Sequence, residues 1–453
     1  MTTSSKFREK ITQNLPTYLA ELNQIVNQKS LSTKKEGIQE MAQMIEQMLK
    51  DSGFKTELLT VDHSNPYILA EIGKGDTTLL FYNHYDTQPA DDTELWKTEP
   101  FKLTEKEGKL YARGVADNKG NLILRLQAFR LIQETLGKIP VKIIWIIEGE
   151  EEVGSGNLEK FSETYGHRWE KADLCIWEDG GVDTQGRPLV KLGQKGAYFA
   201  ELYIKMGEKD LHSRNASMVD SATWRLIHAL ATLRDVNGNV TIDGLNKYIT
   251  PPTPEEDEMT RKLDFDMAAT LKALHRNEYI KKSQKKEEVL KTHYYSHTCN
   301  IDGIWSGYTE PGKVKSIIPN EATAKIDIRL TDTFDVNKVH ALLRKHLDKR
   351  GFNDVEIKDM VKLQVAKSDS RDPFVQRTIE ILRTSYGKEP QVEVISGGSG
   401  PQYSVAGKFG ISKVDVGCEN PDSSLHGPNE NIVIEDYVNG MVATIDLVLG
   451  LAK

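Results

Sequence analysis

Apolar residues recur at helical spacing near the start of the chain. In residues 7–30 and again in residues 35–50, apolar side chains fall three or four positions apart, which predicts two amphipathic helices. Nearly continuous apolar runs follow at residues 66–72, 77–83, 142–147 and 173–177. Such runs are typical of strands covered on both faces, and a helix-like segment at residues 119–136 separates two of them. The alternation predicts an α/β domain with a mixed, largely parallel sheet and helices on both faces.

The pattern changes after residue 191. Residues 198–206 and 323–330 alternate apolar and polar side chains, as half-exposed antiparallel strands do. Two helical stretches and a further strand complete the set, at residues 219–233, 336–347 and 355–361. A two-layer α+β domain with its helices on one face of the sheet is the simplest assembly of these elements.

A long polar insertion, residues 238–297, divides this middle region. It contains several prolines and a charge run at residues 281–288, so its composition favours a solvated connector. Elements of the α/β type return near the end of the chain, at residues 373–386, 413–416 and 434–451. The sequence therefore predicts a first domain built from residues 1–191 and 367–453, interrupted by a second domain at residues 192–366.

Length, charge and cysteine content narrow the class of protein. At 453 residues the chain exceeds the roughly 250 to 300 residues at which a single core stops growing. Its 38% hydrophobic and 28% charged residues predict a soluble protein, and the net charge of -8 argues against a nucleic-acid partner. Cys175, Cys299 and Cys418 form no CxxC pair, which favours the reducing cytoplasm. No stretch approaches the roughly 18 apolar residues that span a bilayer, so no membrane partner is expected.

Candidate chemistry begins where the second predicted strand ends. His84 and Asp86 follow this strand directly, and ligands of open α/β sheets bind beyond the carboxyl ends of strands. A carboxylate two positions away could orient the imidazole of a metal-bound histidine. A structural histidine is the alternative for His84, just as a helix N-cap is the alternative for Asp117 before the helix-like segment.

Acidic residues follow the next two strands. One strand runs into a row of glutamates that includes Glu151 and Glu152, whose like charges would repel one another unless cations or protons neutralise them. The other strand ends in Glu178 and Asp179, either of which could reach a metal. An acidic surface loop is the alternative. His426 lies in a loop after the last predicted strand, and two histidines with three carboxylates form a set that suits zinc, manganese or cobalt.

Together these strings resemble the motifs of the two-zinc exopeptidase family, which includes carnosinase, cytosolic nonspecific dipeptidase, aminoacylase, glutamate carboxypeptidase and the acetylornithine deacetylase / succinyl-diaminopimelate desuccinylase enzymes. The resemblance rests on His84-x-Asp86, residues 114–120, Glu151-Glu152 before Val153-Gly154-Ser155, and His426 before Pro428-Asn429-Glu430. It covers essentially the whole chain, with the motifs in the family's order. It implies a zinc-peptidase-like catalytic domain interrupted by a ferredoxin-like α+β lid domain, and a cis peptide bond between Asp117 and Asn118.

The resemblance also implies roles for individual residues. The metal ligands, carried over by position, are His84, Asp117, Glu152, Asp179 and His426. Asp117 would bridge two divalent ions, zinc or else manganese or cobalt. Glu151 would act as general base and acid, and Asp86 would support a metal-bound histidine. Two assignments stay open, because three successive glutamates allow a one-residue shift and Glu178 could replace Asp179.

The predicted lid domain holds candidate substrate-binding residues. On sequence alone, His212 and Arg329 could be an ordinary surface histidine and arginine. In the family, they resemble the histidine that stabilises the tetrahedral oxyanion, often across a dimer, and the arginine that grips the substrate's carboxylate. Arginine suits that task because its planar fork binds a carboxylate through two hydrogen bonds. Gly398 and Ser399 would add donors near the same carboxylate, and a homodimer through the lid domain is implied.

These observations predict an enzyme that uses a metal-activated water to hydrolyse the amide bond of dipeptides or short peptides with a free carboxylate. The long insertion resembles the carnosinase and nonspecific dipeptidase branch of the family. Deacylation of N-acyl amino acids, or desuccinylation, is the alternative within the family. A non-catalytic protein that binds metal or peptide, and a scaffold protein without metal, are the alternatives outside it.

Overall fold

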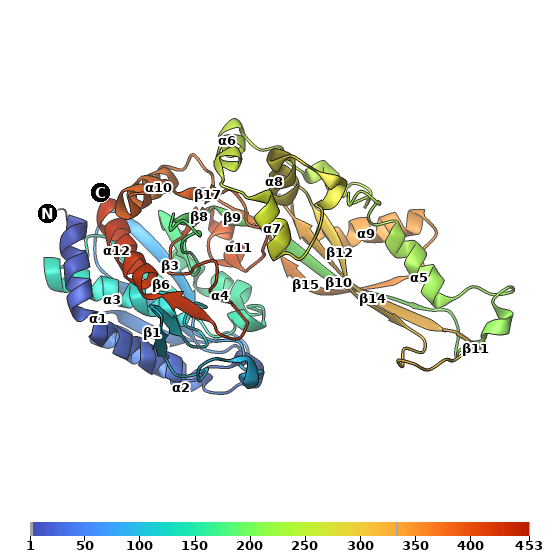
Figure 1. The fold of residues 1–453 in the computed structure, drawn as a ribbon, viewed down its shortest axis with the longest axis horizontal. Helices are drawn as coiled ribbons and strands as arrows, with labels where there is room; N and C mark the ends of the chain where they lie inside the picture. Colours follow the sequence, from blue (N-terminus) through green and yellow to red (C-terminus); the bar gives the residue numbers. More distant parts are fainter. Residues whose placement is uncertain (1–2, 332–333, 453) are drawn as a thin grey trace. The chain divides into compact units, whose positions relative to one another are not determined.

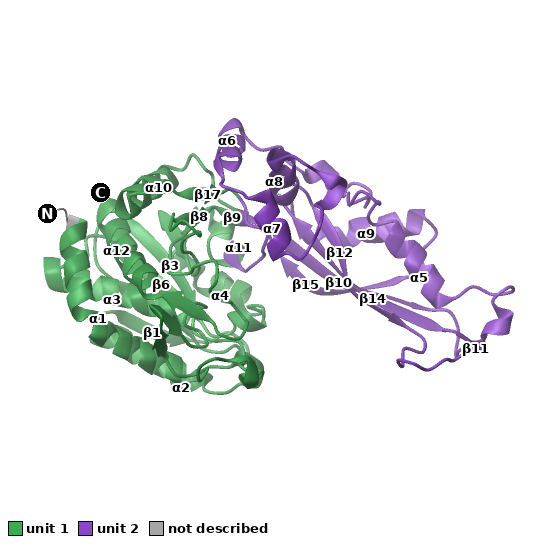
Figure 2. Cartoon of the chain, viewed as in Figure 1, with its two compact units in different colours: residues 1–193, 367–394, 404–453 green, residues 194–366, 395–403 purple. Residues whose placement is uncertain are grey.

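A computed structural model describes residues 3–331 and 334–452 of the chain. The residues form two compact units (Figure 2): unit 1 comprises residues 1–193, 367–394 and 404–453, and unit 2 comprises residues 194–366 and 395–403. The sequence prediction assigned residues 395–403 to the first domain. They cluster with unit 2 because Ser396 forms a parallel bridge to Gln194, and the carbonyl of Gly398 accepts a hydrogen bond from the N–H of Lys195 at 2.9 Å.

Unit 1 is built on a six-stranded sheet with the order β1-β2-β6-β3-β7-β18 (Figure 1). Its strands are β1 (Lys55–Leu59), β2 (Tyr67–Ile72), β3 (Thr78–His84), β6 (Lys142–Glu148), β7 (Leu174–Trp177) and β18 (Lys413–Asp415). β3 runs parallel to β6 and β7, and β18 runs parallel to β7, whereas β1 and β2 are antiparallel to their neighbours. The predicted mixed, largely parallel sheet is confirmed. The carboxyl ends of its four parallel strands therefore lie at one edge.

Helices cover both faces of this sheet, as predicted. Phe129 of α3 packs its ring against Phe81 and Trp145 on one face. On the other face, Phe161 of α4 stacks on Tyr67. The helices of unit 1 are α1 (Thr3–Asn27), α2 (Ile38–Asp51), α3 (Lys119–Leu136), α4 (Leu158–Tyr165), α10 (Pro373–Tyr386) and α12 (Ile434–Gly450), and the short helix α11 (Gln402–Val405) has residues in both units. Short strands complete the set: β4 (Thr104–Lys106), β5 (Lys109–Tyr111), β8 (Leu189–Lys191), β9 (Gly193–Gln194), β16 (Ala366–Lys367), β17 (Gln391–Glu393) and β19 (Asn431–Val433).

Unit 2 contains a four-stranded sheet with the order β12-β14-β10-β15, in which every pair is antiparallel. Its strands are β10 (Gly196–Lys205), β12 (Thr298–Ser306), β14 (Glu321–Leu330) and β15 (Glu356–Leu363), and a separate small pair is formed by β11 (Leu211–His212) and β13 (Ile317–Ile318). The helices α5 (Ala222–Ala231) and α9 (Lys338–Lys349) pack on this sheet (Figure 1). This is the predicted two-layer α+β arrangement.

The polar insertion is folded, and the prediction of a solvated connector is wrong. It contains α6 (Pro254–Lys262), α7 (Met267–Ala273) and α8 (Lys286–Tyr295), and it buries Leu263, Leu290 and Tyr294. The hydroxyl of Thr253 caps the first turn of α6 and Glu256 returns the bond, with Pro254 at the first helical position. These short helices need few apolar residues for packing. Charged surface residues therefore dominate the composition of the insertion, which made it resemble a solvated connector.

Within the six-stranded and four-stranded sheets, two strands were not predicted, and both lie at sheet edges. Both β1 and β12 have mostly exposed or half-exposed residues, so neither shows an apolar run or a clear alternation.

All three cysteines are buried free thiols. Within the described ranges, no helix combines the length and the apolar character needed to cross a bilayer.

Candidate metal centre

The loops after β3 and β6 are joined through Asp86. His84 is the last residue of β3 and lies opposite Glu148, the last residue of β6. Two positions later, the buried carboxylate of Asp86 accepts hydrogen bonds from the backbone N–H groups of Glu151 and Glu152, at 3.2 and 3.0 Å. The carbonyl oxygen of Asp86 lies 3.0 Å from Nδ1 of His84 and holds the imidazole ring. Asp86 thus fixes the histidine and the glutamate turn relative to each other.

Asp117 stands between two imidazole rings. Its Oδ1 lies 2.9 Å from Nε2 of His84, and its Oδ2 lies 3.0 Å from Nε2 of His426. The same nitrogen of His426 lies 3.1 Å from Oε2 of Glu152. The ligand atoms of His84, Asp117 and Glu152 all lie within 4.8 Å of one another. Four of the five ligands expected from the sequence therefore converge on one point.

Glu430 holds the loop that carries Asp117. Its buried carboxylate accepts hydrogen bonds from the backbone N–H groups of Gly114, Ala116 and Asp117, at 2.8, 2.8 and 2.9 Å, and it pairs with Arg113 at 2.7 Å. The peptide bond from Asp117 to the next residue is cis, as the family resemblance implied. Glu430 belongs to the motif after His426, but the sequence pattern alone did not predict its role. Its position just after His426 was the available signal.

Glu178 and Asp179 face different partners. Oε2 of Glu178 lies 3.8 Å from Nε2 of His84, and its Oε1 accepts a hydrogen bond from the indole of Trp177 at 3.0 Å. Asp179 has Lys191 as its main attractive charge, and burial raises the pKa of Asp179 to about 6 in spite of that ammonium. Glu178 therefore has an oxygen within 4 Å of His84, whereas the largest attractive charge on Asp179 is that of Lys191.

The pKa values of the clustered residues indicate that positive charge at the centre of the cluster is favourable. Burial opposes the ionisation of Asp117, but hydrogen bonds from His426 and His84 bring its pKa below the usual range. Hydrogen bonds to Asp117 and Glu152 raise the pKa of His426 to about 10. Burial favours the neutral ring of His84, yet its bonds to Asp117 and Asp86 raise its pKa well above the ordinary value. The raised pKa values of both histidines favour their charged rings, which would supply the positive charge that divalent cations would otherwise bring.

The carboxyl group of Glu151 has a raised pKa. Burial, followed by repulsion from Asp117, Glu152 and Asp86, raises its pKa to about 8. A carboxyl group with such a pKa exchanges its proton near neutral pH, which is what a general acid and base requires. Its backbone is held by Asp86, so its position is fixed even though its side chain is not a member of the converging ligand set.

The donor set fits divalent metal ions. Imidazole nitrogens and carboxylate oxygens are ligands of zinc, manganese and cobalt. Oε2 of Glu178 is buried and has no hydrogen-bond partner among the described residues. Buried polar atoms are rarely left in that state, and a cation beside His84 would satisfy it.

The predicted substrate-binding residues lie in unit 2. His212 ends β11, and its exposed ring accepts a hydrogen bond from the N–H of Arg214 at 3.1 Å. Arg329 lies on β14, with Nε donating to Asp327 at 2.9 Å and its guanidinium over the ring of Phe199 at 5.1 Å. The hydroxyl of Ser399 lies 3.4 Å from the carbonyl of Gly196, and Gly398 is the residue that accepts from Lys195.

Comparison with known proteins assigns the family. The sequence profile described as Peptidase family M20/M25/M40 matches residues 80–449, which include every residue of the cluster. The chain belongs to this peptidase family. The family resemblance seen in the sequence is thereby confirmed, and this M20-family peptidase is an enzyme.

Relatives of this peptidase include named dipeptidases. It is 29% identical over 393 residues to the Beta-Ala-His dipeptidase of Homo sapiens, covering 83% of this chain and 75% of that protein. It is 27% identical over 390 residues to the Cys-Gly metallodipeptidase DUG1 of Saccharomyces cerevisiae, covering 83% of this chain and 80% of that protein. Among solved structures, the M20 family metallo-carboxypeptidase Sso-CP2 from Sulfolobus solfataricus matches with a TM-score of 0.88 and 37% identity, covering 95% of this chain and 98% of that one.

Proposed function

We propose that this M20-family peptidase hydrolyses the amide bond of dipeptides or short peptides that carry a free carboxylate. The observation that carries the proposal is the convergence of His84, Asp117, Glu152 and His426 on one point, with Glu151 in the adjoining turn. The names of the relatives, two dipeptidases and a carboxypeptidase, support an exopeptidase that acts on small peptides.

Two divalent cations, zinc in the first place, complete the proposed site. Asp117 would bridge them, with His84 on one side and with Glu152 and His426 on the other. We propose Glu178 as the carboxylate that joins His84, because its unpartnered Oε2 lies 3.8 Å from that imidazole, and Asp179 is the alternative. Bound there, such ions would acidify a water and polarise the scissile carbonyl.

The chain's own residues perform the proton transfer. Glu151, with a pKa of about 8, would take the proton of the attacking water and deliver it to the leaving amine. Such positioned transfer contributes about 10² to 10⁴ in rate. The two hydrogen bonds to Asp86 would keep Glu151 and Glu152 in place during the cycle.

Unit 2 would bind the substrate and form a homodimer. Arg329 would hold the free carboxylate with its Nη atoms, since Nε is engaged by Asp327. His212 would stabilise the oxyanion in the partner's site, and Gly398 and Ser399 would supply further donors. The dimer is supported by exposed apolar side chains near the edge strand β12, whose described residues pair with β14 alone. Trp224 and Trp305 are 59% and 45% exposed, and the hydroxyls of Thr223 and Ser306 join α5 to β12 at 2.8 Å.

The proposed compartment is the cytoplasm. All three cysteines are buried as free thiols, and unpaired thiols are usual in a reducing environment. A thiol count on the purified protein under denaturing conditions, with every thiol reactive, would agree with this placement.

The decisive experiment is a substrate panel with the metal-stripped and reloaded protein. Ala-Ala, β-Ala-His and Cys-Gly would be compared with N-acetyl-alanine, N-succinyl-alanine and Ala-Ala-amide, after reloading with zinc, manganese or cobalt. The proposal expects hydrolysis of the free dipeptides only. Turnover of the acylated amino acids alone would assign a deacylase, and two bound metals without turnover of any compound would assign a binding protein.

A further inference from the structure

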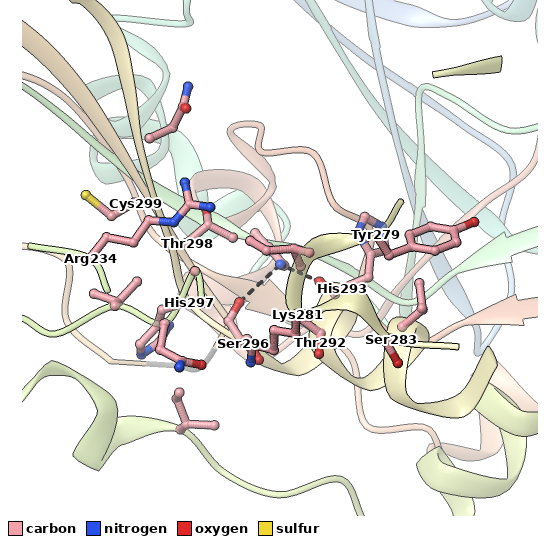
Figure 3. Close-up of a pocket in the computed structure, with 18 of the residues that line it drawn as sticks. Arg234, Tyr279, Lys281, Ser283, Thr292, His293, Ser296, His297, Thr298 and Cys299 are labelled. Carbon is pink, nitrogen blue, oxygen red and sulfur yellow. Dashed lines mark hydrogen bonds between the residues drawn. The ribbon is translucent and has the colours of Figure 1, made fainter. Parts of the chain in front are cut away.

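Unit 2 contains a cavity of 660 Å³ that the proposed function does not use. It lies among the helices of the insertion, the loop after α5 and the start of β12 (Figure 3). Its volume is within the range of small-molecule sites, about 300 to 1,000 Å³. Apolar side chains form much of the wall, among them Phe265, Leu274, Tyr279 and Ile280. Leu274 and Ile280 are exposed large hydrophobic residues, so the wall offers apolar surface to a ligand.

The charged side chains that line the cavity are cations. Lys195, Arg234 and Lys281 line it, and no aspartate or glutamate is among its described lining residues. No ion pair joins any of these three cations to a carboxylate within the described part of the chain. The nearest acid in sequence, Asp235, lies outside the lining, and hydrogen bonds from the amides of Asn239 and Asn237, together with the charge of Lys281, lower its pKa. A cation-lined cavity without acids favours an anionic ligand.

Lys195 adds a buried cation to this set. Only 2% of the residue is exposed, and Nζ donates to the carbonyl oxygens of His293 and Ser296. An ammonium group has three N–H donors, so one donor is left without a protein acceptor among the described residues. Burial, together with repulsion from Arg329, lowers the pKa of Lys195 to about 8. An anion in the cavity would offset this cost.

The wall of the cavity is formed by two segments in close contact. Gly238 has a φ of +83°, and a Cβ atom there would lie 2.1 Å from Cδ1 of Ile280. The loop after α5 and the turn before α8 are therefore held together without space for a side chain between them. In Figure 3, Arg234 and Cys299 lie at one end of the view of the cavity, and Tyr279 and Ser283 lie at the other. Cationic and apolar groups thus both line the cavity.

We propose that this cavity binds a small organic monocarboxylate with an aromatic or branched apolar body. The carboxylate would pair with the exposed side chains of Arg234 and Lys281, and the body would lie against Phe265, Leu274 and Ile280. The site is separate from the metal cluster in its residues, all of which belong to unit 2. It is assigned from its own lining and does not depend on the peptidase activity.

The test uses 4-phenylbutyrate, which has no amide bond to cleave, in isothermal titration calorimetry with the full chain. We expect a dissociation constant below about 1 mM, and binding weaker by about tenfold or more for 4-phenyl-1-butanol and for inorganic phosphate. The double variant R234Q/K281Q should lose about tenfold or more, whereas the matched double variant K282Q/K285Q, in the same insertion but outside the lining, should stay within about twofold. Leu274→Asp should abolish binding, because it places an anion on an exposed part of the wall.

Three outcomes would overturn the proposal. The first is no heat of binding for 4-phenylbutyrate at about 10 mM in the wild type. The second is equal affinity for the alcohol, which would remove the role of the cations. The third is an R234Q/K281Q variant that binds as the wild type does. A loss of affinity in Arg329→Gln would then place the ligand at Arg329, the residue predicted to hold the substrate's carboxylate.

Discussion

Oδ2 of Asp86 accepts a hydrogen bond from the backbone N–H of Glu152 at 3.0 Å. This bond links the end of β3 to the turn after β6, and the other oxygen of the same carboxylate accepts from the N–H of Glu151 at 3.2 Å. The side chain of Asp86 is fully buried, and a buried charge needs compensation. The two N–H donors and the neighbouring imidazole of His84 provide it. Asp86 thereby supports the predicted ligands His84 and Glu152 and the predicted base Glu151.

Replacing Asp86 by asparagine should weaken metal binding. The amide NH₂ would face the backbone N–H of Glu151 or Glu152, so one of the two hydrogen bonds would be replaced by repulsion between donors. We expect metal affinity to fall by about 10 to 100-fold, with a corresponding loss of kcat/KM. Metal analysis after dialysis at fixed free zinc measures the effect. Asp91→Asn, on an exposed aspartate paired with Lys34, is the control, and unchanged metal affinity in D86N would contradict the assigned role.

Replacing Glu151 by glutamine should separate metal binding from turnover. The side chain is not in the converging ligand set, so the metal content should equal that of the wild type. Loss of proton transfer should lower kcat by about 10² to 10⁴. Glu159→Gln, on an exposed residue of α4, serves as the control. If the variant loses metal, Glu151 is itself a ligand, and the roles assigned to the successive glutamates are shifted by one position.

Glu178 and Asp179 can be distinguished by parallel substitutions. Glu178→Gln should lower metal affinity by about tenfold or more, because its oxygen beside His84 would lose its charge. Asp179→Asn should keep metal affinity within about twofold, since its main attractive charge is Lys191. Competition with a chromophoric zinc chelator gives both affinities. Loss of metal from D179N and retention by E178Q would establish Asp179 as the ligand.

The sequence predicted the buried parts of the fold better than its edges. The strands β3, β6 and β7 have nearly continuous apolar runs because both of their faces are covered, and the candidate ligands follow them directly. The edge strands β1 and β12 and the helical insertion have mostly exposed side chains, so their patterns resembled those of loops. Periodicity alone could not choose between Glu178 and Asp179. Adjacent residues at a strand end point in different directions, and only the three-dimensional positions of His84 and Lys191 distinguish them.

Metal binding should stabilise the protein more as the pH rises. In the metal-free protein the pKa of His426 is about 10, above its ordinary value, so the ion pairs of the charged ring are fully present below pH 6.5 and are lost as the pH rises through 10. The carboxyl group of Glu151, with its pKa raised to about 8, acts in the same direction, because the unfolded state releases its proton first. Cations need the neutral ring and the carboxylate, so protons compete with them at low pH.

The melting temperature should therefore respond to zinc in a pH-dependent manner. The difference in Tm between zinc-loaded and chelator-treated protein should widen from pH 6 to pH 9. Differential scanning fluorimetry at constant free zinc measures it. His426→Asn, which removes one titrating ligand, should show a smaller change with pH, and an increment that is the same at every pH would contradict the coupling between protons and metal.

Complementation between two inactive variants should test whether His212 acts across the dimer. The exposed ring of His212 lies on the short strand β11, and Glu151 lies in the turn after β6. In a mixed dimer of His212→Asn and Glu151→Gln chains, one site would contain an intact Glu151 and receive an intact His212 from the other chain. Because a two-fold interface is symmetric, an equal mixture should regain about a quarter of the wild-type activity per chain. Subunit exchange followed by a dipeptide assay measures the recovery. A Trp305→Glu background, which introduces charge into the exposed apolar surface near β12, should prevent it, and recovery without any dimer in sedimentation analysis would refute action in trans.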